Sequence, residues 1–276
     1  MTNGDTRLGP GGRVAAIVMG AVLVLTATPA VAVVDGQQDT ESVYANVGQL
    51  VKRFDGEWFG ACSGTLVGEA IVLTAAHCVD DVIALDGLGI EDVGIVFDPM
   101  PGPASILYGV DRIEVHPDWL TRSPVRGGGR PVALGPGAED VALMWLSDPV
   151  AGIEPASIIA AGGLDALDLT GETFTVVGYG FTEFVTGSLL SPRWEAEASG
   201  RSFRNVSVIT EHEAIADRYL MITASACFGD SGGPLLLGET VVAVNTWTSS
   251  WRCEAPAFSY RLDAERAQWF LDAWLS

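Results

Sequence analysis

Three short stretches of this 276-residue sequence carry side chains that could perform acyl transfer together. The most specific is residues 229–234, Gly-Asp-Ser-Gly-Gly-Pro. A serine flanked by glycines can lie on a sharp turn with its hydroxyl exposed, and backbone N–H groups that converge there can hold a developing oxyanion. Taken alone, a glycine-rich hexapeptide is also compatible with an ordinary turn.

The other two stretches offer a base and a carboxylate. His77 follows the apolar run 70–74, and an imidazole there could serve as general base because it ordinarily titrates near neutral pH. Asp140 opens the apolar run 141–146, where a buried carboxylate could accept a hydrogen bond from that imidazole. Each residue alone is equally compatible with a structural role at a strand end. His116 resembles part of a turn, and His212, between two glutamates, a solvated helix face.

Short β-rich runs must position these side chains. Such runs recur at residues 70–74, 141–146, 174–178 and 240–244, broken by Gly, Pro and Asp, which favours an all-β barrel or sandwich. Two segments, 210–220 and 263–275, have helical character, the second with an apolar face. A break near residues 148–149 predicts domains over 33–150 and 151–276. The Gly/Pro-rich residues 122–138 either overhang the site or form a surface insertion.

The N-terminus has the layout of a secretory signal peptide. Two arginines precede the apolar run 14–25, and residues 30–32, Ala-Val-Ala, form a small-residue cleavage site. The alternative is a membrane anchor, but the run is shorter than the ~20 residues that span a bilayer. We expect removal of residues 1–32, secretion, and no membrane association afterwards.

Composition narrows the partners. The formal net charge is −20 with a single lysine, Lys52, so nucleic acid and anionic lipid are disfavoured. The acidity serves either solubility or attraction of cationic substrates. Four cysteines in an exported chain suggest two disulfides. Three pairings are possible, and the positions favour one early and one late pair. No cysteine lies in a C-x-x-C pair, which disfavours zinc.

Taken together, these stretches resemble the trypsin/chymotrypsin family of serine proteases, in the form of a bacterial-type secreted precursor. The chain order His, Asp, Ser is that of the family. Further matches follow in family order over nearly the whole mature chain, at residues 33–36, 62–66, 115–117, 178–180, 245–247 and 256–262. The resemblance implies an all-β fold of two antiparallel Greek-key β-barrels with a C-terminal α-helix.

The resemblance also implies residue roles. Ser231 is the nucleophile, His77 the general base and then acid, and Asp140 the group that orients His77. The N–H groups of Gly229 and Ser231 form the oxyanion hole. The implied disulfides, which agree with the positional pairing, are Cys62–Cys78 and Cys227–Cys253. We expect an endopeptidase acting on protein or peptide, as a monomer, with no cofactor and no metal.

Activation and specificity follow from the same resemblance. A new N-terminal amine at Val33 pairs with Asp230, so signal cleavage after Ala32 itself activates the chain; later trimming is the alternative. Ser225 aligns with the floor of the specificity pocket, and Thr248 and Ala257 with its walls. A neutral floor and extra methyl groups predict cleavage after uncharged, small-to-medium apolar residues.

Two other functions remain open. The chain could be a catalytically inactive homologue that acts as a binding protein, although such homologues usually lose a triad member. It could also be an esterase, because the triad chemistry does not distinguish esters from amides.

Overall fold

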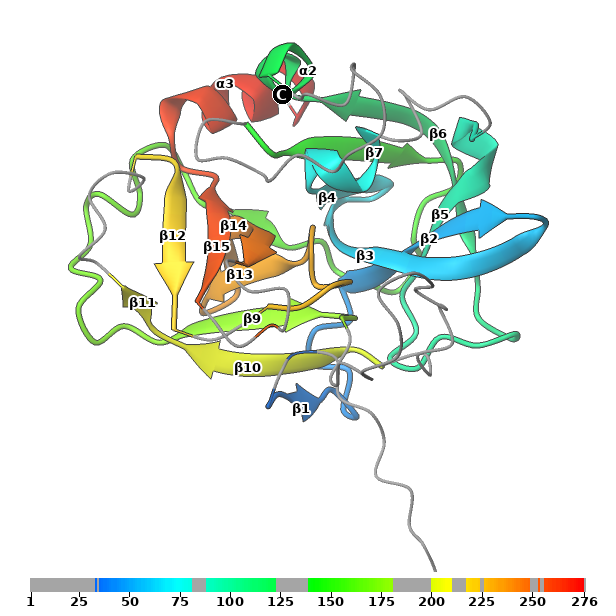
Figure 1. The fold of residues 1–276 in the computed structure, drawn as a ribbon, viewed down its shortest axis with the longest axis horizontal. Coiled ribbons are helices and arrows are strands. Elements are labelled where there is room, and N and C mark those ends of the chain that lie inside the picture. Colours follow the sequence, from blue (N-terminus) through cyan, green and yellow to red (C-terminus); the bar gives the residue numbers. More distant parts are fainter. Residues whose placement is uncertain are drawn as a thin grey trace, which may run out of the picture.

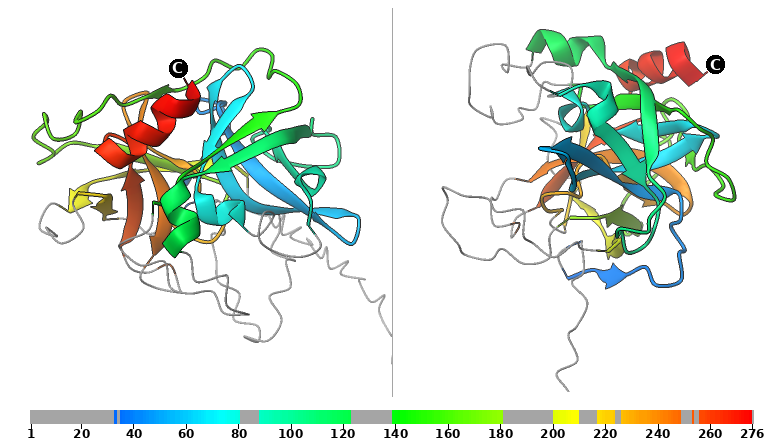
Figure 2. Two further views of the ribbon diagram at one scale, coloured as in Figure 1. Left: turned by 90° about the horizontal axis from the view of Figure 1, so that it is seen from above. Right: turned by 90° about the vertical axis from the view of Figure 1, so that its right-hand side faces the viewer.

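Short β-strands make up most of the fold (Figure 1). The computed structural model describes residues 33, 35–80, 88–122, 139–180, 200–209, 217–223, 226–248, 253 and 256–275. Within these ranges the strands fall into two sheets that lie side by side, joined by a C-terminal helix (Figures 1 and 2).

The first sheet is a closed antiparallel barrel with the strand order β2-β3-β4-β7-β6-β5. It closes where β2 pairs with β5, with Gln49 opposite Val96. Its inner face carries fully buried aliphatic side chains such as Leu50, Leu73 and Leu143. The strands are β2 (Val47–Phe54), β3 (Glu57–Gly68), β4 (Ile71–Thr74), β5 (Val93–Val96), β6 (Tyr108–Val115) and β7 (Ala142–Leu146).

The second sheet follows the path β1-β10-β9-β13-β14-β15-β12-β11, which is open among the described strands, and β8 pairs in parallel with β14. The N-terminal strand β1 therefore belongs to this sheet, although β2 belongs to the barrel. The strands are β1 (Gln37–Gln38), β8 (Ser157–Ile158), β9 (Phe174–Gly178), β10 (Ser202–Val206), β11 (Val208–Ile209), β12 (Tyr219–Ile222), β13 (Pro234–Leu237), β14 (Thr240–Thr248) and β15 (Ala257–Arg261).

The C-terminal helix α3 (Glu265–Leu275) ties the second sheet to the barrel. It buries Ala267, Phe270 and Leu271, and the ring of Trp274 meets that of Trp145 on β7 edge-on at 5.9 Å. A short helix, α2 (Pro117–Arg122), lies near it (Figure 2). One core cluster extends through the barrel, part of the second sheet and α3, and a second cluster lies within the second sheet. None of the described helices is both long and apolar enough to cross a bilayer.

The predicted fold class and the runs predicted as strands are confirmed. The helix predicted at 263–275 is also present. The helix predicted at 210–220 is wrong at its C-terminal end, because Tyr219 and Leu220 lie in strand β12, paired with Tyr260 and Ser259; residues 210–216 lie outside the described residues. The turn expected around His116 leads directly into α2, with Pro117 as its first residue, a position that suits proline.

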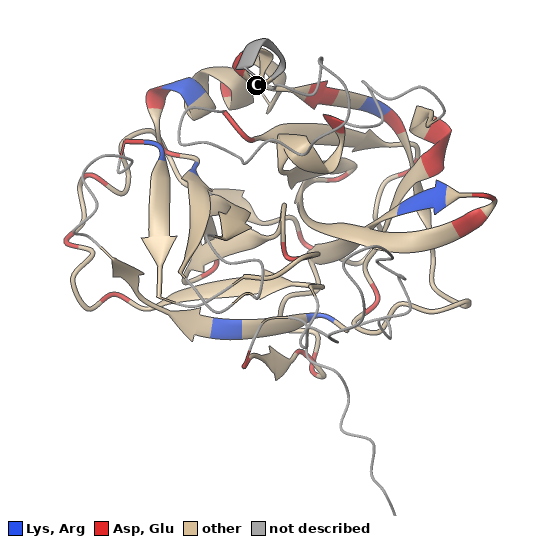
Figure 3. Ribbon diagram, in the orientation of Figure 1, with Lys and Arg blue, Asp and Glu red and all other residues tan. Residues whose placement is uncertain are grey.

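Acidic side chains are spread over both halves. Figure 3 shows Asp and Glu on strand ends and connections of both sheets, with few Lys and Arg among them. Among the described residues, the acidic residues are therefore not confined to one of the two sheets.

Candidate active site

His77 and Asp140 are brought together by the pairing of β4 with β7. Thr74, the last residue of β4, lies opposite Ala142, the first residue of β7. In an antiparallel pair these two ends share one edge, so the residues just beyond them meet. His77 stands three positions after Thr74, in the single-turn 3₁₀ helix Ala76–Cys78, and Asp140 stands two positions before Ala142.

Asp140 binds His77 with both carboxylate oxygens. Oδ1 accepts the backbone N–H of His77 at 2.9 Å, and Oδ2 lies 2.8 Å from ring atom Nδ1. The Asp140 side chain is 1% exposed, whereas that of His77 is 22% exposed. A buried carboxylate next to Nδ1 favours the tautomer with the proton on Nδ1, so Nε2 can accept a proton on the open side.

Ser231 lies on a turn built by glycines. Gly229 and Gly232 have φ angles of 98° and 82°, in the left-handed region that favours glycine. A side chain on Gly232 would clash with Thr74 and with the Ser63 carbonyl. The Ser231 carbonyl accepts the N–H of Ser63 at 2.7 Å. Through these contacts the serine turn packs closely against the end of β4 that leads to His77.

The Ser231 hydroxyl points to a backbone carbonyl in this structure. Its Oγ donates to the Thr246 carbonyl at 3.3 Å, and no hydrogen bond joins it to His77 among the described residues. The N–H groups of Gly229 and Ser231 also lack an internal acceptor in the part of the chain that the structure describes. Two backbone donors beside an alcohol are thus available to an oxygen atom of a bound molecule.

Asp230 is a fully buried carboxylate beneath this turn. Its Oδ1 accepts the N–H of Gly180 and its Oδ2 that of Cys227, both at 2.8 Å. Burial raises the pKa of Asp230 to about 7, and the two backbone hydrogen bonds oppose that rise. Among the described residues no cation pairs with Asp230. Val33, also buried, donates its backbone N–H to Ser202 Oγ at 2.5 Å and not to Asp230. In the full chain this nitrogen is a peptide amide and carries no charge.

The predicted pocket residues are only partly described. Ser225 lies outside the described residues. Thr248 ends β14 directly opposite Ala257, which begins β15 and is buried. The two predicted wall residues are therefore cross-strand neighbours. Beside them the rings of Trp247 and Phe258 stack with their centroids 3.9 Å apart.

Both predicted disulfides are present, Cys62–Cys78 and Cys227–Cys253. The first ties the segment of His77 to β3. Cys62, His77 and Cys78 place possible metal-ligand atoms within 4.8 Å of one another. Because the two sulfur atoms are joined to each other they cannot bind as thiolates, so this group does not fit a metal ion.

Four neighbours of the site were not predicted as site residues, although Ser63 and Thr246 lie in stretches that match the family. Thr246 supplies the carbonyl that holds Ser231. Ser63 Oγ donates to the Gly229 carbonyl at 2.8 Å and accepts the Tyr179 N–H at 3.0 Å. Trp119 on α2 places its ring centroid 6.5 Å from that of His77. Such roles depend on which strands become neighbours, and no local spacing reveals that.

Glu139, the fourth neighbour, joins the strand of Asp140 to the second sheet. It is 1% exposed and accepts the Tyr260 hydroxyl at 2.6 Å, and Arg218 lies 3.4 Å from its other oxygen. Burial and the Glu139 carboxylate both raise the pKa of Tyr260, which keeps its hydroxyl as a donor. This contact crosses from one sheet to the other directly beside the His77–Asp140 pair.

A barrel that presents a histidine–aspartate pair to a serine turn on an adjoining sheet is the architecture of a chymotrypsin-like serine protease fold. The chain belongs to the trypsin family: the family model named Trypsin matches residues 37–264. It is 28% identical to the vitellin-degrading protease of Bombyx mori over 68% of this chain and 66% of that one.

Two further relatives are similar at comparable identity. The chain is 26% identical to serine protease 7 of Drosophila melanogaster over 64% of this chain and 46% of the other, and 27% identical to the chymotrypsin-like elastase family member 1 of Canis lupus familiaris over 72% and 74%. The matched region thus spans less than two thirds of the length of the first two relatives.

Proposed function

We propose that this protein is a serine endopeptidase that hydrolyses peptide bonds with Ser231 as nucleophile, His77 as general base and acid, and Asp140 as the orienting carboxylate. The observation that carries the proposal is the double contact of buried Asp140 with the ring and the backbone of His77. This contact fixes the ring through Nδ1, and Nε2, which lies 3.7 Å from the disulfide sulfur of Cys78, is the proposed base.

The proposed reaction starts with a rotation of the Ser231 hydroxyl from the Thr246 carbonyl to His77 Nε2. Oγ attacks the carbonyl carbon of the substrate while its proton moves to Nε2, and the oxyanion is held by the N–H groups of Gly229 and Ser231. The imidazolium then protonates the leaving amine, and an acyl-enzyme remains. Water, deprotonated by the same nitrogen, attacks the acyl carbon and releases Ser231 and the carboxylic acid product.

We propose that the residue before the cleaved bond is uncharged and small to medium in size. Thr248 and Ala257 are cross-strand neighbours on β14 and β15. Their methyl groups would therefore narrow the proposed specificity pocket at one place along its wall. Ser225 gives the pocket floor no charge to pair with Arg or Lys. The elastase relative is in keeping with this preference. Cleavage of a peptide library chiefly after Arg or Lys would overturn it.

We further propose secretion, with removal of residues 1–32 by signal peptidase and activation by the new α-amine of Val33 pairing with Asp230. The buried Asp230 carboxylate supports the activation step, because its raised pKa marks a site where a cation would be stabilising. N-terminal sequencing of the fully active secreted protein tests it. A first residue other than Val33 would overturn the proposal of activation by signal cleavage alone.

The decisive test of the proposed function is Ser231→Ala in the secreted protein. We expect peptide hydrolysis to fall by several orders of magnitude while peptide binding persists. A fluorophosphonate probe should label wild type on Ser231 and leave the variant unlabelled. The matched control is Ser157→Ala, which removes an exposed hydroxyl on β8. Hydrolysis that survives Ser231→Ala would refute the role of Ser231 as nucleophile. A wild-type protein that binds peptide without turnover would indicate a binding protein, and one that hydrolyses only esters would indicate an esterase.

A further inference from the structure

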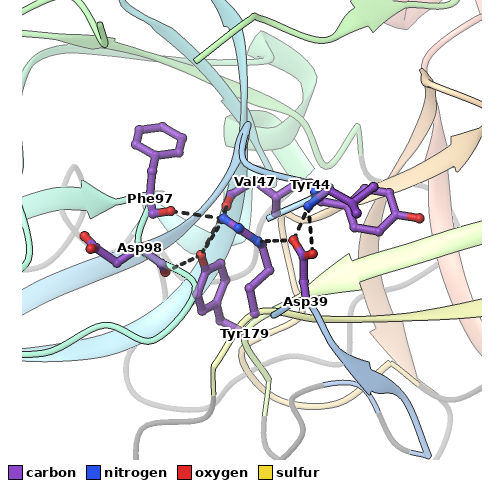
Figure 4. A network of polar contacts seen from close by, with 8 residues as sticks. Asp39, Tyr44, Val47, Phe97, Asp98 and Tyr179 are labelled. Carbon is purple, nitrogen blue, oxygen red and sulfur yellow. Dashed lines mark hydrogen bonds and ion pairs between the residues drawn. The ribbon is translucent and has the colours of Figure 1, made fainter. Parts of the chain in front are cut away.

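A buried ion pair holds the N-terminal segment against the second sheet. Arg201 and Asp39 are 0% and 1% exposed, and Nε of Arg201 lies 2.8 Å from Oδ2 of Asp39 (Figure 4). Asp39 also accepts the backbone N–H groups of Val43 and Tyr44. Because a buried charge that lost its partner would be costly, residues 39–44 are fixed firmly to the residue that precedes β10.

The next residue, Ser202, holds the other end of the same segment. Its side chain is fully buried, and its Oγ accepts the Val33 N–H at 2.5 Å. Between these two anchor points β1 pairs with β10, with Gln38 opposite Ser202. Val33 and residues 37–39 are therefore all held by the short stretch 201–203.

Ser202 and Asp230 both contact the end of strand β9. Ser202 pairs with Gly178 of β9, and a side chain on Gly178 would clash with the Asp230 carboxyl. Gly180, two residues further along the chain, donates its N–H to that carboxyl. Between them Tyr179 lies 3.3 Å through its hydroxyl from Nη1 of Arg201 (Figure 4). The nitrogen of Val33 thus contacts Ser202, and the carboxyl of Asp230 contacts residues 178 and 180 of the strand end paired with Ser202.

We propose that Ser202 is a positioning residue that receives the α-amine of Val33 after cleavage and directs it toward Asp230. The inference rests on the activation step of the proposed function and adds the residue that orients the amine. An α-ammonium has three N–H donors. Ser202 Oγ accepts one of these N–H groups, as it accepts the amide N–H of Val33 in the uncleaved chain. The other two N–H groups are then available to the Asp230 carboxylate.

Among the residues that the structure describes, few other charges lie on the elements around this amine. The neighbouring elements carry Asp230, the mutually compensated Asp39–Arg201 pair, and the Asp35–Arg204 pair, in which Asp35 is 80% exposed and the two groups lie 3.4 Å apart. Burial of the amine disfavours its charged form, whereas the Asp230 carboxylate and Ser202 Oγ favour it. Removing the Ser202 hydroxyl therefore lowers the pKa of the amine.

The experiment measures the pKa of the amine without catalysis. A specific protease site is inserted directly before Val33 in the full chain carrying Ser231→Ala, and the cleaved protein is pulse-labelled with acetic anhydride from pH 6 to 10. Lys52, the only lysine, is buried, so an added short peptide with a free α-amine serves as the internal reference for labelling. Mass spectrometry of the N-terminal peptide gives the titration of Val33.

With Ser202 intact we expect an amine pKa above the ~7.7–8.0 of a free α-amine, and with Ser202→Ala a value roughly one unit lower. Ser202→Cys, closer to serine in volume but with a weak acceptor, should shift it in the same direction. The control Ser157→Ala should leave it unchanged. Equal titration curves for wild type and Ser202→Ala, with equal thermal midpoints, would overturn the role of Ser202. Because the assay uses no turnover, its outcome is separate from that of the Ser231→Ala activity test.

Discussion

Two buried aspartates, one at the edge of each sheet, are satisfied in different ways. Asp140 on the barrel side accepts two N–H groups from one residue, His77, through its backbone and its ring. Asp230 beneath the serine turn accepts two backbone N–H groups from Cys227 and Gly180, and burial raises its pKa to about 7. The barrel side already holds its base in place, whereas the second sheet holds a carboxylate that a cation would stabilise. The comparison is in keeping with the proposed activation step, in which the new α-amine of Val33 supplies that cation in the second sheet.

The largest effect expected is that of Asp140→Asn. An asparagine amide would donate to Nδ1 of His77, so the ring proton would move to Nε2 and the base would be lost. We expect kcat to fall roughly 10⁴-fold, with partial recovery at high pH, in a pH profile of peptide hydrolysis. Asp118→Asn, a half-exposed carboxylate paired with Arg266 on the same side of the molecule, is the control. A loss of less than tenfold would mean that Asp140 does not orient the base.

The second prediction concerns Asp230 in the uncleaved chain. Its pKa of about 7 in the folded state lies above the unfolded value near 3.9, so the folded form keeps a proton that the unfolded chain releases. Its contribution to stability is fully present below about pH 4 and is lost as pH rises to about 7. Relative to Asp230→Asn, the free energy of unfolding should fall by roughly 1.4 kcal/mol per pH unit across that range.

Urea unfolding of both uncleaved chains between pH 4 and pH 8 measures this difference. Cleavage before Val33 should remove the slope, because the new α-ammonium then favours the ionised carboxylate. Parallel curves of unfolding free energy against pH for the two uncleaved chains would show that the ionised Asp230 carboxylate is already stabilised without a new amine. The contrast between Asp230 and Asp140 would then disappear.

The smallest effect expected is that of Ser63→Ala. Ser63 Oγ connects the Gly229 carbonyl to the Tyr179 N–H, so its loss leaves both groups without that partner and loosens the Gly229 peptide. We expect kcat to fall roughly tenfold with KM nearly unchanged, because the Gly229 N–H acts on the transition state. Steady-state kinetics with Ser157→Ala as control checks this. A rise in KM at constant kcat would assign Ser63 to substrate binding.

The sequence predicted the site residues from three short stretches that are ambiguous one by one, and their order and resemblance to the trypsin family supplied the roles. The residue pattern around His77, Asp140 and Ser231 is read along the chain, because each lies next to an apolar strand or a glycine turn whose character is set by its immediate neighbours. The C-terminal helix was accessible from its local apolar pattern, whereas the cysteine pairing came from chain position and the family resemblance. The helix expected up to Leu220 failed because the pairing of β12 with β15 outweighed a weak local preference.

Tertiary structure alone decided the contacts that join distant segments. Ser63 lies 166 positions from Gly229, and Val33 lies 169 from Ser202. Ser63 lies in a stretch that matches the family, but nothing in that stretch reveals its contact with Gly229, and Ser202 and Arg201 look in sequence like ordinary surface residues. Their roles arise only when β-strands from different parts of the chain become neighbours and exclude water. Residue type and spacing therefore determined which chemistry this protein carries, while strand pairing and burial determined which polar groups hold it in position.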